Sequence, residues 1–213
     1  IKKHFRIESS SKLGIIPGSA SAVALSVALT YLYETQKSGL ERISEVNIYS
    51  DSQFMHLDVT AMKNLELVST MRSNDKKGSL LWVLDKTKTA LGRRLIRQWV
   101  EQPLLNFAEI TARHNAVEEL TGNSIVCSNL REALMGILDI ERIMTRISYG
   151  TAGGKELRAL CQTASKLPEI KEQLSLLHSK LFIKANEKLD DLQDIYALID
   201  NIIVEEPPFS VRE

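Results

Sequence analysis

Apolar side chains recur with a helical period along most of the chain. Residues 18–37 are apolar on nearly every side and rich in Ala and Ser, which predicts a helix surrounded by other elements. From Ser79 onward the helical period continues almost without interruption. Helices are predicted over residues 18–37, 58–67, from Thr87 or Thr89 to Pro103, and over about 106–120, 139–148, 155–167, 169–178 and 190–204.

Residues that favour helix ends support several of these boundaries. Asp58 and Asp139 stand where side chains commonly cap the first turn of a helix. Asn106, with Glu109 three residues later, resembles a capping box. Gly150 follows the segment that Asp139 opens and is the expected stop of that helix.

Two segments carry a strand pattern instead of a helical one. Residues 43–49 and 53–58 hold β-branched or alternating apolar side chains, and residues 50–52 between them favour a turn. No repeat of fixed period is visible. The sequence therefore predicts a mainly α fold, an irregular multihelical domain with a small β-hairpin near its N-terminal third.

Composition narrows the classes of function. The chain has 213 residues, 44% of them apolar, and its 27 Lys and Arg balance 27 Asp and Glu, so any nucleic-acid role must rest on a local patch. Cys127 and Cys161 lack metal-ligand spacing and are predicted to be reduced thiols of a cytosolic protein. The apolar run at 22–33 is too short for a membrane span, so we expect no membrane partner. The chain opens without Met, and we expect a piece of a longer protein.

Candidate chemistry is sparse. The loop at 149–156 combines glycines with Lys155, but Tyr149 stands where a phosphate loop needs Gly, and Glu156 stands where it needs Ser or Thr. A helix stop followed by a helix start explains this loop better. The histidines are scattered without the spacing of zinc ligands, and no nucleophile is accompanied by a base. We therefore predict no catalytic, cofactor-binding or metal-binding residue.

A basic stretch at 80–104 is the most distinctive segment. On a helical wheel Leu91, Leu95 and Trp99 form one apolar stripe, and Gly92 borders it where another backbone could approach. The arginines of this helix fall opposite, where they could pair with an acidic helix such as that of Glu118–Glu119 or touch phosphate. Pairing is favoured because no base-reading side chain shares their face. The cations of the stretch are Lys86, Lys88, Arg93, Arg94 and Arg97.

The same stretch resembles a known family. VLDKTKTALGRRLIRQWVEQPL (83–104) resembles the signature region of the core, or lever, domain of the MutS family of DNA mismatch repair proteins, in its bacterial form. Four more segments match that family in order, and HFRIESSSKLG near the N-terminus resembles the end of its connector domain. These four segments are LDVTAMKNLEL (57–67), RHNAVEEL (113–120), LDIERIMTRIS (138–148) and EEPPFSVRE (205–213).

The resemblance implies domain boundaries and a role. Residues 1–37 would close the connector domain, and 38–213 would form the first segment of the core/lever domain, ending before the clamp. The family binds mismatched double-stranded DNA as a dimer, uses ATP and Mg to become a sliding clamp, and recruits MutL. Its mismatch-reading, clamp and ATPase parts have no counterpart here, so we expect a non-enzymatic helical scaffold that couples them, in a cytoplasmic, nucleoid-associated bacterial protein.

Under this interpretation the residues of interest are structural. The cations named above would contact neighbouring domains or a DNA backbone, and the segment alone would bind DNA weakly or not at all. Two alternatives stay open: an autonomous nucleic-acid-binding helical module, or a MutS relative that acts outside mismatch repair. The predicted structural signature is Leu84, Leu91, Gly92, Leu95, Trp99 and Pro103.

Overall fold

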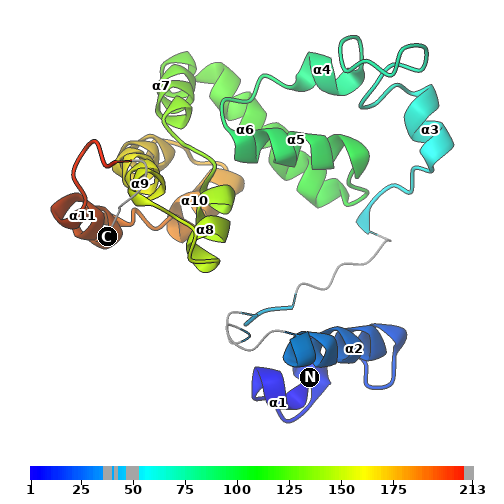
Figure 1. Cartoon of the computed structure of the whole chain (residues 1–213). Helices are drawn as coiled ribbons and strands as arrows, with labels where there is room; N and C mark the ends of the chain where they lie inside the picture. Colours follow the sequence, from blue (N-terminus) through cyan, green and yellow to red (C-terminus); the bar gives the residue numbers. More distant parts are fainter. Residues whose placement is uncertain (36–39, 41–42, 47–52, 209–213) are drawn as a thin grey trace. The chain divides into compact units, whose positions relative to one another are not determined.

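The chain is helical in a computed structural model, which describes residues 1–35, 40, 43–46 and 53–208. It divides into two compact units, residues 1–51 and 52–213. The predicted boundary between 37 and 38 lies outside the described residues and stays a prediction. The helices are α1 (Lys2–Phe5), η1 (Ser10–Leu13), α2 (Ala20–Thr35), α3 (Val59–Asn64), α4 (Leu80–Leu84), α5 (Ala90–Glu101), α6 (Phe107–Gly122), α7 (Ser124–Met135), α8 (Ile140–Ser148), α9 (Gly154–Ser175), α10 (Lys180–Lys188) and α11 (Gln193–Ile202) (Figure 1).

The first unit is built on α2. Its serine and threonine hydroxyls donate back to carbonyls one turn earlier, as Ser26 does to Ala22 at 2.8 Å. We predicted that other elements would surround this helix, yet among the described residues only Ala22 and Leu29 of α2 are buried. Val23 is 57% exposed and Tyr31 64% exposed. An apolar composition predicts a helix that can be buried, but it does not supply the neighbours that would bury it.

The predicted hairpin is not found among the described residues. Its turn and half of its first segment, residues 47–52, lie outside them. Within the second segment Phe54 forms an isolated antiparallel bridge with Leu104. The Met55 N–H donates to the Pro103 carbonyl at 2.8 Å. The alternating pattern therefore marked extended backbone correctly at this point, but its partner is a segment far along the chain.

The second unit is organised around α9, which α7, α8, α10 and α11 contact on different sides (Figure 1). Because these neighbours cover several sides, α9 buries seven side chains, all apolar except Cys161 and Thr163. The seven are Leu160, Cys161, Thr163, Ala164, Leu167, Ile170 and Leu174. The larger core cluster adds residues of α7 and of two following segments: Val126, Leu130, Ala133, Ile137 and Leu177. The smaller cluster joins α8, α9 and α11 through Ile143, Leu160, Cys161 and Ile199.

One helix prediction around α9 was wrong, and one helix was not predicted. We predicted a break at Pro168, but the helix runs from Gly154 through Pro168 to Ser175. The stabilisation from packing on several sides exceeds the cost of the helical hydrogen bond that Pro168 removes. In addition, residues 179–189 were left without an assigned helix, and α10 lies there.

Local capping was predicted better. The side chains of Asp58, Thr89 and Asp139 accept backbone N–H groups in the first turns of α3, α5 and α8. Asn106 caps α6, although Glu109 accepts from the Asn106 side-chain amide at 3.4 Å rather than completing the expected box. Gly150 ends α8 with φ of 67°, a conformation that glycine adopts readily. No helix in the described ranges is long and apolar enough to cross a membrane.

Candidate functional site

Helices α4 and α5 carry the basic stretch. The Ser79 hydroxyl accepts the Trp82 N–H and starts α4, and the Thr89 hydroxyl accepts the Gly92 N–H at 2.9 Å and starts α5. A Cβ on Gly92 would lie 3.0 Å from Thr89 Oγ1. The close approach predicted at Gly92 is therefore made by the turn that begins its own helix. Helix α5 ends at Glu101, two residues before Pro103.

The predicted apolar face of α5 is only partly covered. Leu91 packs against the larger core cluster, and Val100 is buried. Leu95 is 47% exposed and Trp99 36% exposed, so neither is a core anchor within the described part of the chain. Leu84 of α4, predicted to anchor with them, is 47% exposed. The wheel gives the direction of each side chain but not which part of the stripe meets another helix.

Trp99 instead stacks with a cation from α6. The Arg113 guanidinium lies over the indole ring, 3.6 Å from its centroid. Partial burial lowers the pKa of Arg113, while the charge of Glu109 acts in the opposite direction. The stacking of Arg113 on Trp99 joins α5 to α6. The sequence pattern did not predict this contact because the two residues belong to different helices.

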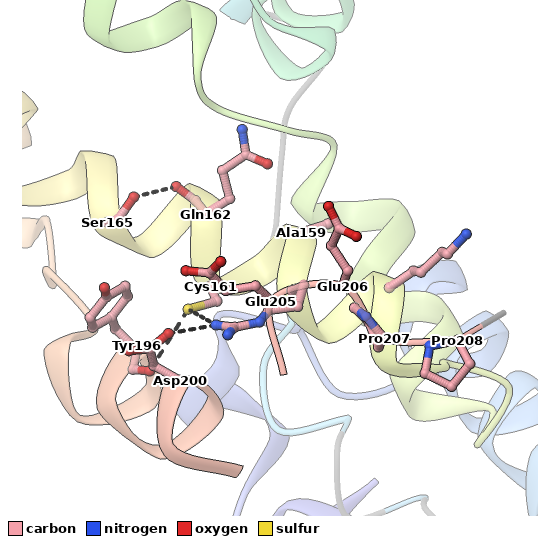
Figure 2. A pocket seen from close by; sticks show the side chains of 12 residues that line it. Ala159, Cys161, Gln162, Ser165, Tyr196, Asp200, Glu205, Glu206, Pro207 and Pro208 are labelled. Atoms are coloured by element: carbon pink, nitrogen blue, oxygen red, sulfur yellow. Dashed lines mark hydrogen bonds and ion pairs between the residues drawn. The ribbon is translucent and has the colours of Figure 1, made fainter. Parts of the chain in front are cut away.

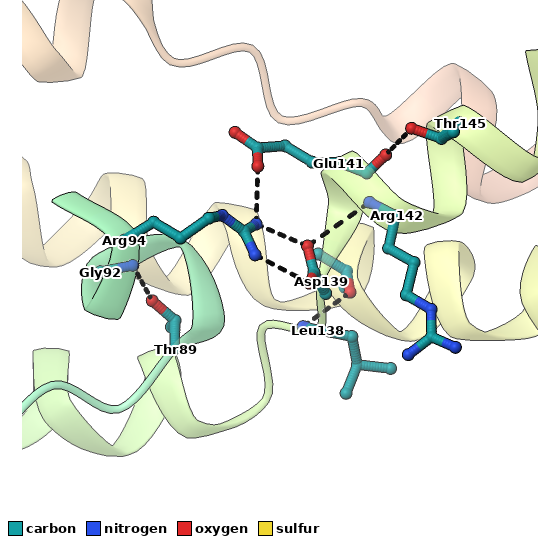
Figure 3. A network of polar contacts seen from close by, with 9 residues as sticks. Thr89, Gly92, Arg94, Leu138, Asp139, Glu141, Arg142 and Thr145 are labelled. Carbon is teal, nitrogen blue, oxygen red and sulfur yellow. Dashed lines mark hydrogen bonds and ion pairs between the residues drawn. The ribbon is translucent and has the colours of Figure 1, made fainter. Parts of the chain in front are cut away.

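Arg94 makes the most extensive polar contact of the basic stretch (Figure 3). Its two terminal nitrogens donate to the two carboxylate oxygens of Asp139 at 3.0 and 2.7 Å, across 45 positions of sequence. One of them also lies 2.7 Å from Glu141. The hydrogen bond from Arg94, more than any other contact, holds the pKa of Asp139 below its ordinary range. A bidentate contact of this kind fixes both distance and orientation.

Asp139 also forms the N-cap of α8. Its Oδ1 accepts the Arg142 N–H at 3.4 Å and thereby caps α8. The start of α8 is thus tied directly to the middle of α5. We expected the arginines to pair with an acidic helix such as that of Glu118–Glu119, but Glu119 instead accepts the backbone N–H groups of His178 and Ser179 ahead of α10.

The other cations of the stretch make local contacts. Arg93 Nε lies 3.4 Å from Asp85, and Arg97 Nε lies 2.9 Å from Glu101 one turn later. The Lys86 ammonium lies over the Trp82 ring, 5.9 Å from its centroid, and Lys88 is exposed. Among the described residues, Arg94 is the cation of this stretch that contacts the start of α8, while Arg93 and Arg97 pair with carboxylates close to them in sequence.

A pocket of about 740 Å³ lies between α9, α11 and the segment after α11 (Figure 2). Sequence reasoning missed its central residue, Arg158. This side chain donates to Asp200 at 2.5 Å, to the Val204 carbonyl at 2.8 Å and to Cys161 Sγ at 3.7 Å. Because the partners lie more than forty positions later, apart from Cys161, no local pattern could have found this contact. Through these hydrogen bonds Arg158 joins α11 and the following segment to α9.

The loop at 149–156 is held by contacts within the protein. In the loop at 149–156, the Gly153 N–H donates to Glu156 at 2.9 Å, and Glu156 also pairs with Arg146. The loop is thus a helix stop and a helix start, as predicted, with its glutamate bound to protein groups. Over the described ranges, no three His, Cys, Asp or Glu side chains gather as metal ligands would. The polar side chains described above therefore make contacts between helices.

Comparisons with known proteins identify the family of this chain. The model of the family described as MutS domain III matches residues 60–213. The protein named DNA mismatch repair protein MutS from Lachnoclostridium phytofermentans is 44% identical over 213 residues, which is 100% of this chain and 23% of that protein. Its namesake from Halothermothrix orenii is 44% identical over 211 residues, covering 99% of this chain and 24% of the relative. The namesake from Alkaliphilus oremlandii is 39% identical over 213 residues, which is again 24% of its length.

These matches show the family of the chain and how much of each relative the chain covers. The chain spans about a quarter of the length of the curated relatives it matches. The matched region is the helical domain III, which contains α5, α8 and the bundle around α9. On the match across residues 60–213 and the identity across the whole chain, this chain belongs to the MutS family.

Proposed function

We propose that this chain is part of a DNA mismatch repair protein MutS and serves there as a helical scaffold that couples the mismatch-binding, clamp and ATPase parts. Residues 1–37 would end the connector domain, and 38–213 would form the first segment of the core/lever domain. Binding of mismatched DNA, ATP with Mg, MutL and a second subunit would belong to the whole cytoplasmic protein. The names of the relatives support the repair role.

The contact between Arg94 and Asp139 carries the proposal of coupling. Transmission between distant sites needs packed elements with discrete arrangements. Arg94 joins α5 to the capped start of α8, α8 packs on α9, and Arg158 joins α9 to α11. The described residues thus offer a continuous series of helix contacts, and a displaced α5 would carry the start of α8 with it.

Exposed cations favour a second candidate, an autonomous nucleic-acid-binding module. Lys86 and Lys88 lie on the same segment as Arg93, whose side chain is 73% exposed. This candidate predicts that the 213-residue chain retards a DNA duplex at physiological salt and that Arg93→Gln with Lys88→Gln weakens the retardation. The scaffold proposal predicts no retardation and no preference for a mismatch.

The decisive experiment uses the intact MutS protein that contains this segment. Arg94→Gln removes the contact to Asp139, and Asp139→Asn weakens it while leaving an oxygen that can cap α8. We expect each variant to bind a mismatched duplex without nucleotide as before, but to leave it more slowly when ATP is added. Release is followed by fluorescence anisotropy of a labelled duplex.

Two controls make this result specific. Arg131→Gln, on the exposed side of α7, removes the same charge and should leave release unchanged. The double variant Arg94→Gln/Asp139→Asn should behave like Arg94→Gln, because Arg94→Gln already removes the contact that Asp139→Asn weakens. Normal ATP-induced release in Arg94→Gln, with far-UV circular dichroism showing a folded protein, would contradict the coupling role.

A further inference from the structure

A smaller pocket of about 270 Å³ lies between α4, α5 and the loop that precedes α4. Its described lining residues include four cations, Lys76, Lys86, Arg93 and Arg97, and a single carboxylate, that of Asp85. Trp82 forms an aromatic wall. Cations around a hollow with apolar walls strengthen the local field and favour an anionic occupant. The scaffold role gives no use for this excess of positive charge.

The carboxylate in the pocket is already engaged. Asp85 Oδ1 accepts the Thr87 hydroxyl at 2.6 Å and the Thr87 N–H at 3.2 Å. The Thr87 hydroxyl is the leading cause that holds the pKa of Asp85 below its ordinary range, with smaller contributions from the charges of Arg93 and Lys86. Asp85 is therefore ionised at neutral pH and offsets one of the four positive charges.

The arginines of the pocket contact their partners through Nε. Arg93 reaches Asp85 this way at 3.4 Å, and Arg97 reaches Glu101 at 2.9 Å. The terminal nitrogens of both forks have no hydrogen bond to the described residues, and their side chains are 73% and 53% exposed. Two guanidinium groups that line the same pocket offer several N–H donors, and their planar donor geometry suits a tetrahedral oxyanion.

We propose that this pocket binds a phosphate group, carried by a free nucleotide or by a nucleic-acid backbone. A phosphate monoester carries close to two negative charges at neutral pH, which matches the surplus of cations better than a single carboxylate does. The pocket volume of about 270 Å³ is slightly below the roughly 300 Å³ at which pockets for drug-sized ligands begin. A phosphate together with one attached ring stacked on Trp82 would therefore fill it.

Intrinsic fluorescence tests the proposal directly. The chain has two tryptophans, and Trp99 does not line the pocket, so Trp99→Phe leaves Trp82 as the sole reporter. Titration of this 213-residue variant with pyrophosphate should give a saturable change in emission, and the same titration of Trp82→Phe should give none. Potassium chloride at equal ionic strength should not reproduce the change.

Matched substitutions in the Trp99→Phe background locate the binding. Arg97→Gln lines the pocket, and Arg131→Gln on α7 removes the same charge elsewhere. Loss of one charge-assisted hydrogen bond should weaken pyrophosphate binding about tenfold in the first variant and not in the second. Lys76→Gln and Lys88→Gln form a second pair, of which only Lys76 lines the pocket.

The source of the phosphate follows from two further titrations. Binding of a nucleoside monophosphate at least as tight as pyrophosphate would identify a free nucleotide, and tighter binding of a short duplex with a steep salt dependence would identify a nucleic-acid backbone. An absent or non-saturable signal, equal weakening by Arg97→Gln and Arg131→Gln, or tighter binding of a glutamate-rich peptide would each overturn the proposal. The coupling experiment on Arg94 uses another residue, the intact protein and another readout, so either result can fail without the other. Duplex binding by the 213-residue chain would in addition favour the second candidate function.

Discussion

Substitution of Leu167 by alanine tests whether α9 is the centre of the fold. Leu167 is 8% exposed and belongs to the larger core cluster, together with side chains of α7 and with Ile170 and Leu174 of α9. It stands one position before Pro168, where the sequence predicted a break in the helix. If packing holds α9 together through the proline, loss of this side chain should cost more than its size alone suggests.

The expected magnitude follows from the burial. Leu167→Ala removes three carbon groups worth about 0.8 kcal/mol each when buried, or about 2.4 kcal/mol. An unrelaxed cavity costs about 24 cal/mol per Å³, so a residual void of about 50 Å³ adds about 1 kcal/mol. We expect the free energy of unfolding to fall by about 3 to 4 kcal/mol, a large share of the roughly 5 to 15 kcal/mol of a typical domain.

Urea unfolding followed by far-UV circular dichroism measures this loss, with the slope against urea used to check that the unfolded states are comparable. Leu176→Ala is the matched control, because Leu176 is the C-cap of the same helix and is 51% exposed. The control should cost less than about 0.5 kcal/mol. A loss below about 1 kcal/mol for Leu167→Ala, or equal losses in the two variants, would refute the central role of α9.

Three further predictions concern a cap, a tight contact and a carboxylate. Thr89→Ala should lower the free energy of unfolding in urea by about 1 kcal/mol because α5 loses its N-cap, and Thr89→Ser should retain most of it. Gly154→Ala would place a Cβ 2.7 Å from Pro207 Cβ and should lower the melting temperature in thermal denaturation, by a loss of about 1 to 3 kcal/mol, whereas Gly122→Ala, with open space around it, should not. The pKa of Glu119 is held below its ordinary value of 4.5, chiefly by the first of two backbone N–H groups ahead of α10, so its contribution to stability is present above pH 4.5 and is lost as pH falls through the lowered folded value. Glu119→Gln should therefore reduce the dependence of urea stability on pH below 4.5, and an unchanged pH profile would argue against the contact.

Features that depend on neighbours within one helical turn were determined by the sequence alone. Asp58 and Asp139 cap helices as predicted because each side chain reaches a backbone N–H only three residues ahead. For α5 the sequence left Thr87 and Thr89 as alternatives, and the structure shows Thr89 as the cap. The loop at 149–156 could be recognised as a boundary because glycine and glutamate act there through their own backbone neighbourhood. The ordered segments resembling the MutS family were also present in the sequence, and the family match covers residues 60–213.

Contacts between distant segments were decided only by the tertiary structure. Phe54 bridges Leu104 instead of a neighbouring strand, and α9 continues through Pro168, because partners from elsewhere supply the hydrogen bonds and the packing. The wheel placed Arg94 on the polar face of α5, but its choice of Asp139 depends on where α8 starts in space. A helical period specifies which side chains share a face, whereas their burial or pairing depends on which other helix comes within a few ångströms of that face.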